Sequence, residues 1–144
     1  MAVADVMSLR LVSVGPGDSA QVAVGRMLES GVGSVIVCED NRLLGIFTER
    51  DVLRLVGESP GIDLSNVRVA DVMTTQLATI SPDDDLVAAA KLMGEKRIRH
   101  LPVLQDGNVL GVVGIRDVMR SLMERIWRAH DEGARETAKE LLRR

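Results

Sequence analysis

Thr48 and Asp51, a hydroxyl and a carboxylate three residues apart, are the residues of this chain whose types and spacing best suit chemistry. The carboxylate recurs as Asp117, although Gly114 stands where its hydroxyl partner would be. A carboxylate accepts two hydrogen bonds from a ribose diol, as acidic residues do in other nucleotide-binding folds. Free N–H groups at a helix N-terminus suit a phosphate. Together these groups predict a site for the sugar and phosphate of a nucleotide.

The same pair also has a structural interpretation. A hydroxyl followed three residues later by an acid is the pattern of a capping box, which satisfies free N–H groups at a helix start. The second copy keeps the aspartate as Asp117 but loses the cap hydroxyl, which favours a use besides capping. The residues alone leave both interpretations open.

The sequence contains an internal repeat, whose two copies are offset by 66 residues. Residues 3–7 return as 69–73, and residues 50–52 return as 116–118, without an insertion between them. Both copies should therefore share one backbone plan. A tandem duplication of so small a unit predicts two halves that face each other about a pseudo-two-fold axis, with a pair of related clefts between them.

Each copy is expected to fold as strand–helix–strand–strand–helix, which makes the fold class α+β. In the first copy the apolar periods and turn residues predict a helix over 18–29, strands over 34–38 and 43–47 around a turn at 40–41, and a helix over 49–56. In the second copy they predict an apolar stretch over 77–80, strands over 98–104 and 109–115 joined by an Asp106-Gly107 turn, and a helix over 116–128. We expect the first repeat over 1–60, a linker over 61–66, the second repeat over 67–126 and a C-terminal helical extension over 127–144.

One helix start is predicted from its end signals. Ser81 reads as an N-cap, Pro82 as the first helical residue, and the three acids at 83–85 as its first turn. Adjacent acids fan out around a helix, so a favourable interaction with the helix dipole is a better account of them than a metal site. We expect no bound metal.

The C-terminal helix continues beyond the repeat as an apolar stripe that includes Trp127, and Gly133 is expected to bend or break it. The stripe could pack on its own domain. Because Trp127 on a terminal helix needs cover, we favour self-association.

Composition narrows the function classes. Aromatic residues are 1% of the chain and the net charge is −3, so neither stacking platforms nor a basic footprint for nucleic acid is expected. With no apolar run long enough to span a bilayer and no leader, we expect a soluble cytoplasmic protein without a membrane partner. The lone Cys38 fits a reducing compartment. No Ser/His/acid set, His/Cys cluster or P-loop is present, so we expect no catalysis.

At its repeated motif the sequence resembles the cystathionine-β-synthase (CBS) domain pair, or Bateman module, over residues 3 to about 123. The family pattern at the end of each repeat is Gly-hydrophobic-x-Thr/Ser-x-x-Asp. The first copy matches at Gly45, Thr48 and Asp51, and the second matches at Gly111 and Asp117. The Asp-Val-Met openings at Asp5 and Asp71 and the run 99–103 are also similar to the family.

This resemblance implies a sheet-and-helix sandwich with two adenosine-nucleotide clefts between the copies. In the family, the hydroxyl and acid of one repeat face the early strands of the other. The first cleft would then use Thr48, Arg50, Asp51, Thr79, Ile80, Ile98, Arg99, His100 and Pro102. The second cleft would use Ser13, Val14, Val32, Gly33, Ser34, Gly114, Arg116 and Asp117.

The two clefts are expected to differ in charge. Residues 96–100 read Lys-Arg-Ile-Arg-His, whereas their counterparts 30–34 read Ser-Gly-Val-Gly-Ser. We therefore expect the Asp51 cleft to bind a phosphorylated adenosine ligand tightly, and the Asp117 cleft to be weak, empty or selective for a less charged ligand. The basic run also fits a solvated helix end.

The function expected from these observations is that of a non-catalytic regulatory module. It would sense AMP, ADP or ATP, form a homodimer and act on a separate effector protein. A structural dimerisation module with degenerate sites, and a binder of S-adenosylmethionine or NAD, remain the alternatives.

Overall fold

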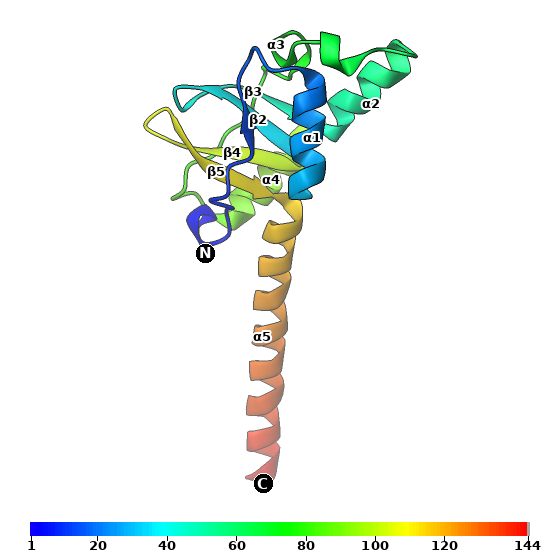
Figure 1. The fold of residues 1–144 in the computed structure, drawn as a ribbon. Helices are drawn as coiled ribbons and strands as arrows, with labels where there is room; N and C mark the ends of the chain where they lie inside the picture. Colours follow the sequence, from blue (N-terminus) through cyan, green and yellow to red (C-terminus); the bar gives the residue numbers. More distant parts are fainter. Residues whose placement is uncertain (144) are drawn as a thin grey trace.

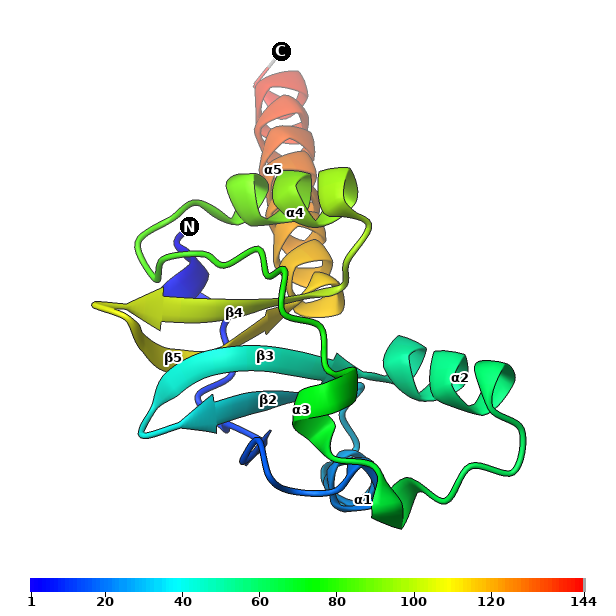
Figure 2. The same cartoon turned by 90° about the horizontal axis from the view of Figure 1, so that it is seen from above.

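The computed structural model describes residues 1–143, which form one five-stranded sheet with helices packed around it (Figures 1 and 2). The strands are β1 (Ser13–Val14), β2 (Ser34–Glu39), β3 (Arg42–Thr48), β4 (His100–Gln105) and β5 (Asn108–Gly114). The helices are α1 (Ala20–Ser30), α2 (Glu49–Glu58), α3 (Val69–Val72), α4 (Leu86–Lys96) and α5 (Ile115–Leu142), with 3-10 turns η1 (Val3–Asp5) and η2 (Leu64–Asn66). The expected α+β fold of two repeats and a C-terminal helix is confirmed.

Each copy contributes one antiparallel hairpin, and the sheet order is β1-β2-β3-β5-β4. The backbone angle φ is positive at both residues of each turn, 51° and 64° at 40–41 and 53° and 81° at 106–107. Such angles are those of the type I′ turns that short hairpins prefer. Pro102 lies in β4, the strand at one end of the sheet order, as its missing N–H requires.

The segment that opens each copy crosses over to the other copy. The N–H of Val3 donates to the carbonyl of Asp84 at 2.8 Å, and its counterpart Val69 donates to the carbonyl of Asp18 at 2.9 Å. These bonds repeat at the offset of the duplication, so they are related by the pseudo-two-fold axis. The two copies are therefore interlocked rather than merely adjacent.

Two core clusters follow from this exchange. The first copy's cluster holds α1, β2 and β3 side chains with Val69 from the second copy's opening segment. The second copy's cluster holds α4, β4, β5 and α5 side chains with Val3 from the first copy's opening segment. Both valines have 0% exposure, so each half completes the core of the other.

The motif glycines lie where the crossing segments pass over the strands. Thr74 exchanges two backbone hydrogen bonds with Ile46, at 3.0 and 2.9 Å, and a Cβ at Gly45 would lie 2.9 Å from the Thr74 carbonyl oxygen. A Cβ at Gly111 would overlap the carbonyl oxygen of Ser8. Both positions thus require glycine because another backbone approaches closely.

The predicted start of the helix in the second copy is wrong. Asp85 is the N-cap of α4, and its side chain accepts from the N–H of Val87 at 2.7 Å. Ser81 precedes the helix, and its N–H donates to the Asp84 carboxylate at 2.9 Å to close a turn. The acids therefore build this turn and the cap instead of a first helical turn.

Helix α5 is continuous from Ile115 to Leu142, so it does not break at Gly133, which was one of the two expected outcomes there. A glycine costs a helix about 1 kcal/mol, which the surrounding helix-forming residues offset. Figure 1 shows the far half of α5 extending away from the sheet. Among residues 1–143, no helix combines the length and apolar character that crossing a bilayer needs.

Candidate functional site

Two clefts lie at the seam between the copies. The first has a volume of about 630 Å³ and is bounded by the start of α2, the segment before residue 79 and the start of β4. Of the residues expected here, the structure places seven on its wall, namely Thr48, Arg50, Asp51, Ile98, Arg99, His100 and Pro102. The same wall carries Thr74, Gln76, Leu77 and Ala78, which the sequence did not reveal.

Thr79 and Ile80 do not line this cleft. Ile80 is 6% exposed and packs in the second copy's core, while its backbone pairs with β4 through Pro102 O and Leu104 N. Thr79 is exposed but lies outside the wall. The chain passes along the cleft before it enters the sheet, so the lining residues precede the pair expected from the family.

Asp51 is the centre of a hydrogen-bonded network. Asp51 is 3% exposed, and its carboxylate accepts from the Thr48 N–H at 3.0 Å and the Thr48 hydroxyl at 3.1 Å. The Thr74 hydroxyl donates to it at 3.1 Å, and the Arg54 guanidinium lies at 3.7 Å. The capping box is therefore real, and Asp51 also fastens the crossing segment of the second copy at Thr74.

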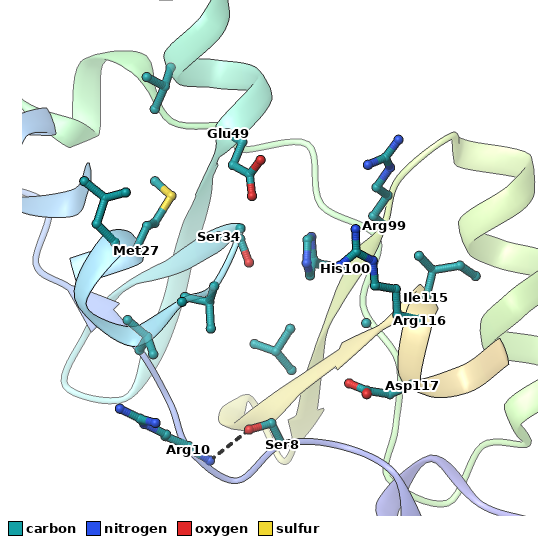
Figure 3. A pocket seen from close by; sticks show the side chains of 18 of the residues that line it. Ser8, Arg10, Met27, Ser34, Glu49, Arg99, His100, Ile115, Arg116 and Asp117 are labelled. Carbon is teal, nitrogen blue, oxygen red and sulfur yellow. Dashed lines mark hydrogen bonds between the residues drawn. The ribbon is translucent and has the colours of Figure 1, made fainter. Parts of the chain in front are cut away.

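The second cleft, shown in Figure 3, has a volume of about 790 Å³. Six of the residues expected here line it, namely Val32, Gly33, Ser34, Gly114, Arg116 and Asp117. Ser13 and Val14 do not. Val14 is 3% exposed in the first copy's core, and Ser13 lies in β1, where its carbonyl accepts from Arg26.

Asp117 is far less engaged than its counterpart Asp51. Its side chain is 49% exposed, and its hydrogen-bond partner in the structure is Arg120 at 3.5 Å. Gly114 offers no cap hydroxyl to Asp117. Ser8, the counterpart of Thr74, accepts from the Arg10 N–H and makes no hydrogen bond to Asp117. Asp117 therefore keeps most of its acceptor capacity for another molecule.

The expected difference in charge between the clefts is not found. Four arginines line the first cleft, Arg50, Arg54, Arg97 and Arg99. Four also line the second, Arg10, Arg99, Arg116 and Arg120. Most of these arginines lie outside residues 30–34 and 96–100, in the segment around residue 10 and in the first two turns of α2 and α5.

A common wall separates the two clefts. Gly33, Glu49, Arg99 and His100 line both of them. Figure 3 shows His100 between Ser34 and Glu49 on one side and Arg116 on the other. A charged group bound in either cleft therefore meets the Arg99 guanidinium and the Glu49 carboxylate.

Burial lowers the pKa of His100 below 6.5, and the positive charges of Arg99 and Arg116 lower it further. Glu49 and Asp117 oppose that shift. Because the folded state disfavours the imidazolium, stability from His100 is present above pH 6.5 and is lost as the pH falls toward the folded pKa.

We therefore expect the unfolding midpoint to decrease on acidification through this window, and the His100→Gln variant to decrease less. Unfolding curves across a pH series measure both slopes. Equal slopes for the two proteins would contradict the assignment to His100.

The residues that were missed share one signal. Ser8, Arg10 and Val12 line the second cleft, and their counterparts at the repeat offset, Thr74, Gln76 and Ala78, line the first. Alternate positions of the two crossing segments thus face the clefts. The repeat offset relates the three residues of one cleft to the three of the other. No local sequence pattern distinguishes either group from its neighbours. Within residues 1–143, no cluster of three or more His, Cys, Asp or Glu could hold a metal ion.

Comparison with known proteins adds to this geometry. A family model described as "CBS domain" matches residues 3–58 and again residues 69–124. The mitochondrial CBS domain-containing protein CBSX3 of Arabidopsis thaliana is 37% identical over 111 residues, which are 74% of this chain and 53% of that protein. This chain thus spans about half the length of that relative.

Solved structures share the same fold. The crystal structure of the CBS domain NE2398 has a TM-score of 0.78 at 30% identity, over 85% of this chain and 98% of that one. The CBS domain pair of MJ0100, solved in complex with 5'-methylthioadenosine and S-adenosyl-L-methionine, has a TM-score of 0.79 at 20% identity, over 87% and 98%. Because the identity to MJ0100 is 20%, the similarity to that structure shows a shared fold alone.

Proposed function

This chain belongs to the CBS domain family as a tandem pair, and we propose that it binds an adenosine-containing nucleotide in the clefts between its copies. CBS domain pairs are generally regulatory ligand-binding modules rather than catalysts. The ligand would act here as a signal of energy or metabolite state. It would not be a catalytic cofactor.

The concentration of positive charge in the clefts carries this proposal. Within residues 1–143, seven arginines but only three acidic residues line the two clefts together. The whole chain has 18 basic and 21 acidic residues. Arginines are thus concentrated at the two clefts although the protein as a whole is acidic. Such clefts are suited to a ligand with phosphate groups.

The remaining lining groups fit an adenosine. In the first cleft, Ile46, Leu77 and Ile98 supply an apolar surface for a base. In the second cleft, the half-exposed carboxylate of Asp117, whose one bond to Arg120 is long, suits the hydroxyls of a ribose. The fold holds adenosine compounds in MJ0100, which supports the class of ligand and not its identity.

We propose AMP, ADP or ATP as the ligand, because the arginines favour phosphate over an uncharged tail. Glu49, in the wall common to both clefts, is the observation that favours S-adenosylmethionine, whose cationic sulfur could pair with it. NAD and a module with degenerate sites are the other candidates. The test below separates these.

The proposal extends to the compartment, the partners and the domain bounds of the protein. We place the protein in the cytoplasm because its lone Cys38 fits a reducing compartment. We also propose a homodimer, a separate effector protein, and repeats over 1–60 and 67–126 with the linker 61–66 and the extension 127–144 around them.

The Asp117→Ala variant tests the nucleotide proposal at the second cleft. Titration of AMP by calorimetry should show binding to the unchanged protein, and the variant should lose at least about tenfold in affinity at that cleft. Asp131→Ala, which removes an exposed acid of α5 outside the cleft, is the matched control and should bind as before. Equal binding by both variants would contradict the role of Asp117.

A further inference from the structure

Helix α5 presents two different sides along its length. Val118 is fully buried in the second copy's core, and Leu122 packs against that core. Met119, Met123, Ile126 and Trp127 lie on another side and are 45, 38, 60 and 58% exposed. Leu141, five turns from Met123, is 63% exposed. Exposed apolar residues therefore run along α5 from the body of the protein to its far end.

These residues form a face without charge, which we call the α5 face. It consists of Met119, Met123, Ile126, Trp127, His130, Gly133, Ala134, Thr137, Ala138 and Leu141. At about 100° per residue, the α5 face covers roughly 140° of the helix circumference over about 33 Å. Every Asp, Glu, Lys and Arg between residues 121 and 141 falls outside it, and Arg120 lies at its edge, in line with Ala138.

The size of the side chains changes along the α5 face in a way that suits a copy of itself. Its large residues, from Met119 to Trp127, lie near the body, whereas Gly133, Ala134 and Ala138 lie in the far half. In an antiparallel pair centred on His130, Trp127 meets the small residues 133–134 of the other helix. Met119 then meets Leu141. Large residues fill the space that small ones leave, as close packing requires.

We propose that the α5 face binds the α5 face of a second copy in antiparallel orientation. The charged side of each helix stays in water, and its five basic and five acidic residues between 124 and 143 carry no net charge that would repel the second copy. Pairing also stabilises the far half of α5, because a helix without tertiary packing is marginal in water. The proposal specifies the surface of the homodimer proposed above and rests on that part of the proposed function alone.

Sedimentation of the full chain over a micromolar concentration range tests the surface. The unchanged protein should form a dimer, and Trp127→Glu should raise its dissociation constant at least about tenfold because a charge enters the apolar contact. Arg128→Glu, on the charged side of the same helix, is the matched control and should dimerise as before. Circular dichroism checks that both variants remain folded, which the exposure of Trp127 leads us to expect.

The outcomes separate the two levels of the proposal. A protein that stays monomeric would overturn the homodimer and the α5 face together. A dimer that Trp127→Glu leaves unchanged would overturn the α5 face alone. Trp127 is the one tryptophan of the chain, so its emission should shift to shorter wavelength as the dimer forms.

Thiol cross-linking tests the orientation. In a Cys38→Ala background, Ile126→Cys and Ala134→Cys variants are mixed and treated with a short bismaleimide. Antiparallel helices should yield the mixed product, because these two positions then lie opposite each other. Self-linked Ile126→Cys without the mixed product would show parallel helices and overturn the proposed arrangement.

Discussion

Replacing Asp51 by alanine is expected to lower the free energy of unfolding by about 3 kcal/mol, whereas Asp117→Ala should lower it by less than about 0.5 kcal/mol. Asp51 is 3% exposed and accepts from the Thr48 N–H, the Thr48 hydroxyl and the Thr74 hydroxyl. Its removal leaves these donors without a partner and releases the crossing segment. Asp117 has half its side chain in water and one long bond to Arg120, so its removal costs little.

Denaturant unfolding of the two variants measures this difference. Asp51→Asn is the informative companion, because an amide keeps the shape of the side chain and can still accept hydrogen bonds. It should recover part of the loss. Equal stabilities for Asp51→Ala and Asp117→Ala would contradict the network described at Asp51. In binding studies, an Asp51 variant can therefore lose affinity because the protein is destabilised. An Asp117 variant remains folded, so its loss of affinity reports on the ligand contact.

Gly111→Ala is expected to destabilise the protein by about 3 kcal/mol or more. The new Cβ would overlap the carbonyl oxygen of Ser8, whose backbone accepts from Val112 at 3.2 Å. Neither backbone can retreat without breaking the pairing between the crossing segment and β5. The crossing segment also brings Val3 into the second copy's core, so the damage would spread beyond one contact.

Gly25→Ala is the matched control for this prediction. Gly25 lies within α1 and has open space around the position of a Cβ. Alanine there should raise the free energy of unfolding by about 0.5 to 1 kcal/mol, since it restricts the unfolded chain and favours helix. Thermal unfolding of both variants gives the comparison. A Gly111→Ala variant as stable as the unchanged protein would mean that the crossing segment does not pack against β5 as the structure has it.

The sequence predicts the fold well because the duplication supplies each element twice. The hairpin turns at 40–41 and 106–107 carry residues that tolerate positive φ. Together with the apolar residues on either side, these turns fix the pairing register of each hairpin. Ser81 and Pro82 predict a start for α4 that is four residues too early. Ser19 caps α1 at the corresponding place, so the repeat itself pointed to Asp85.

The candidate site was predictable only in part. Thr48, Asp51, Gly114 and Asp117 follow from the repeated motif, and the structure brings each of them to a cleft wall. Arg10 and Thr74 were not found, because their role depends on the crossing of the opening segments, which no local pattern encodes. The sequence also does not predict that Asp51 and Asp117 have different environments, because the difference depends on contacts with residues distant in sequence.

Thermal unfolding with AMP, ADP, ATP, S-adenosylmethionine and NAD tests the central claim most directly, which is that the clefts bind an adenosine ligand bearing phosphate. A phosphorylated adenosine compound at 100 times its dissociation constant should add about 2.7 kcal/mol to the free energy of unfolding, and Asp117→Ala should reduce that gain. Stabilisation by S-adenosylmethionine alone would replace the proposed ligand with that alternative. An unchanged midpoint with every one of these compounds would contradict the account and leave a module whose clefts bind none of them.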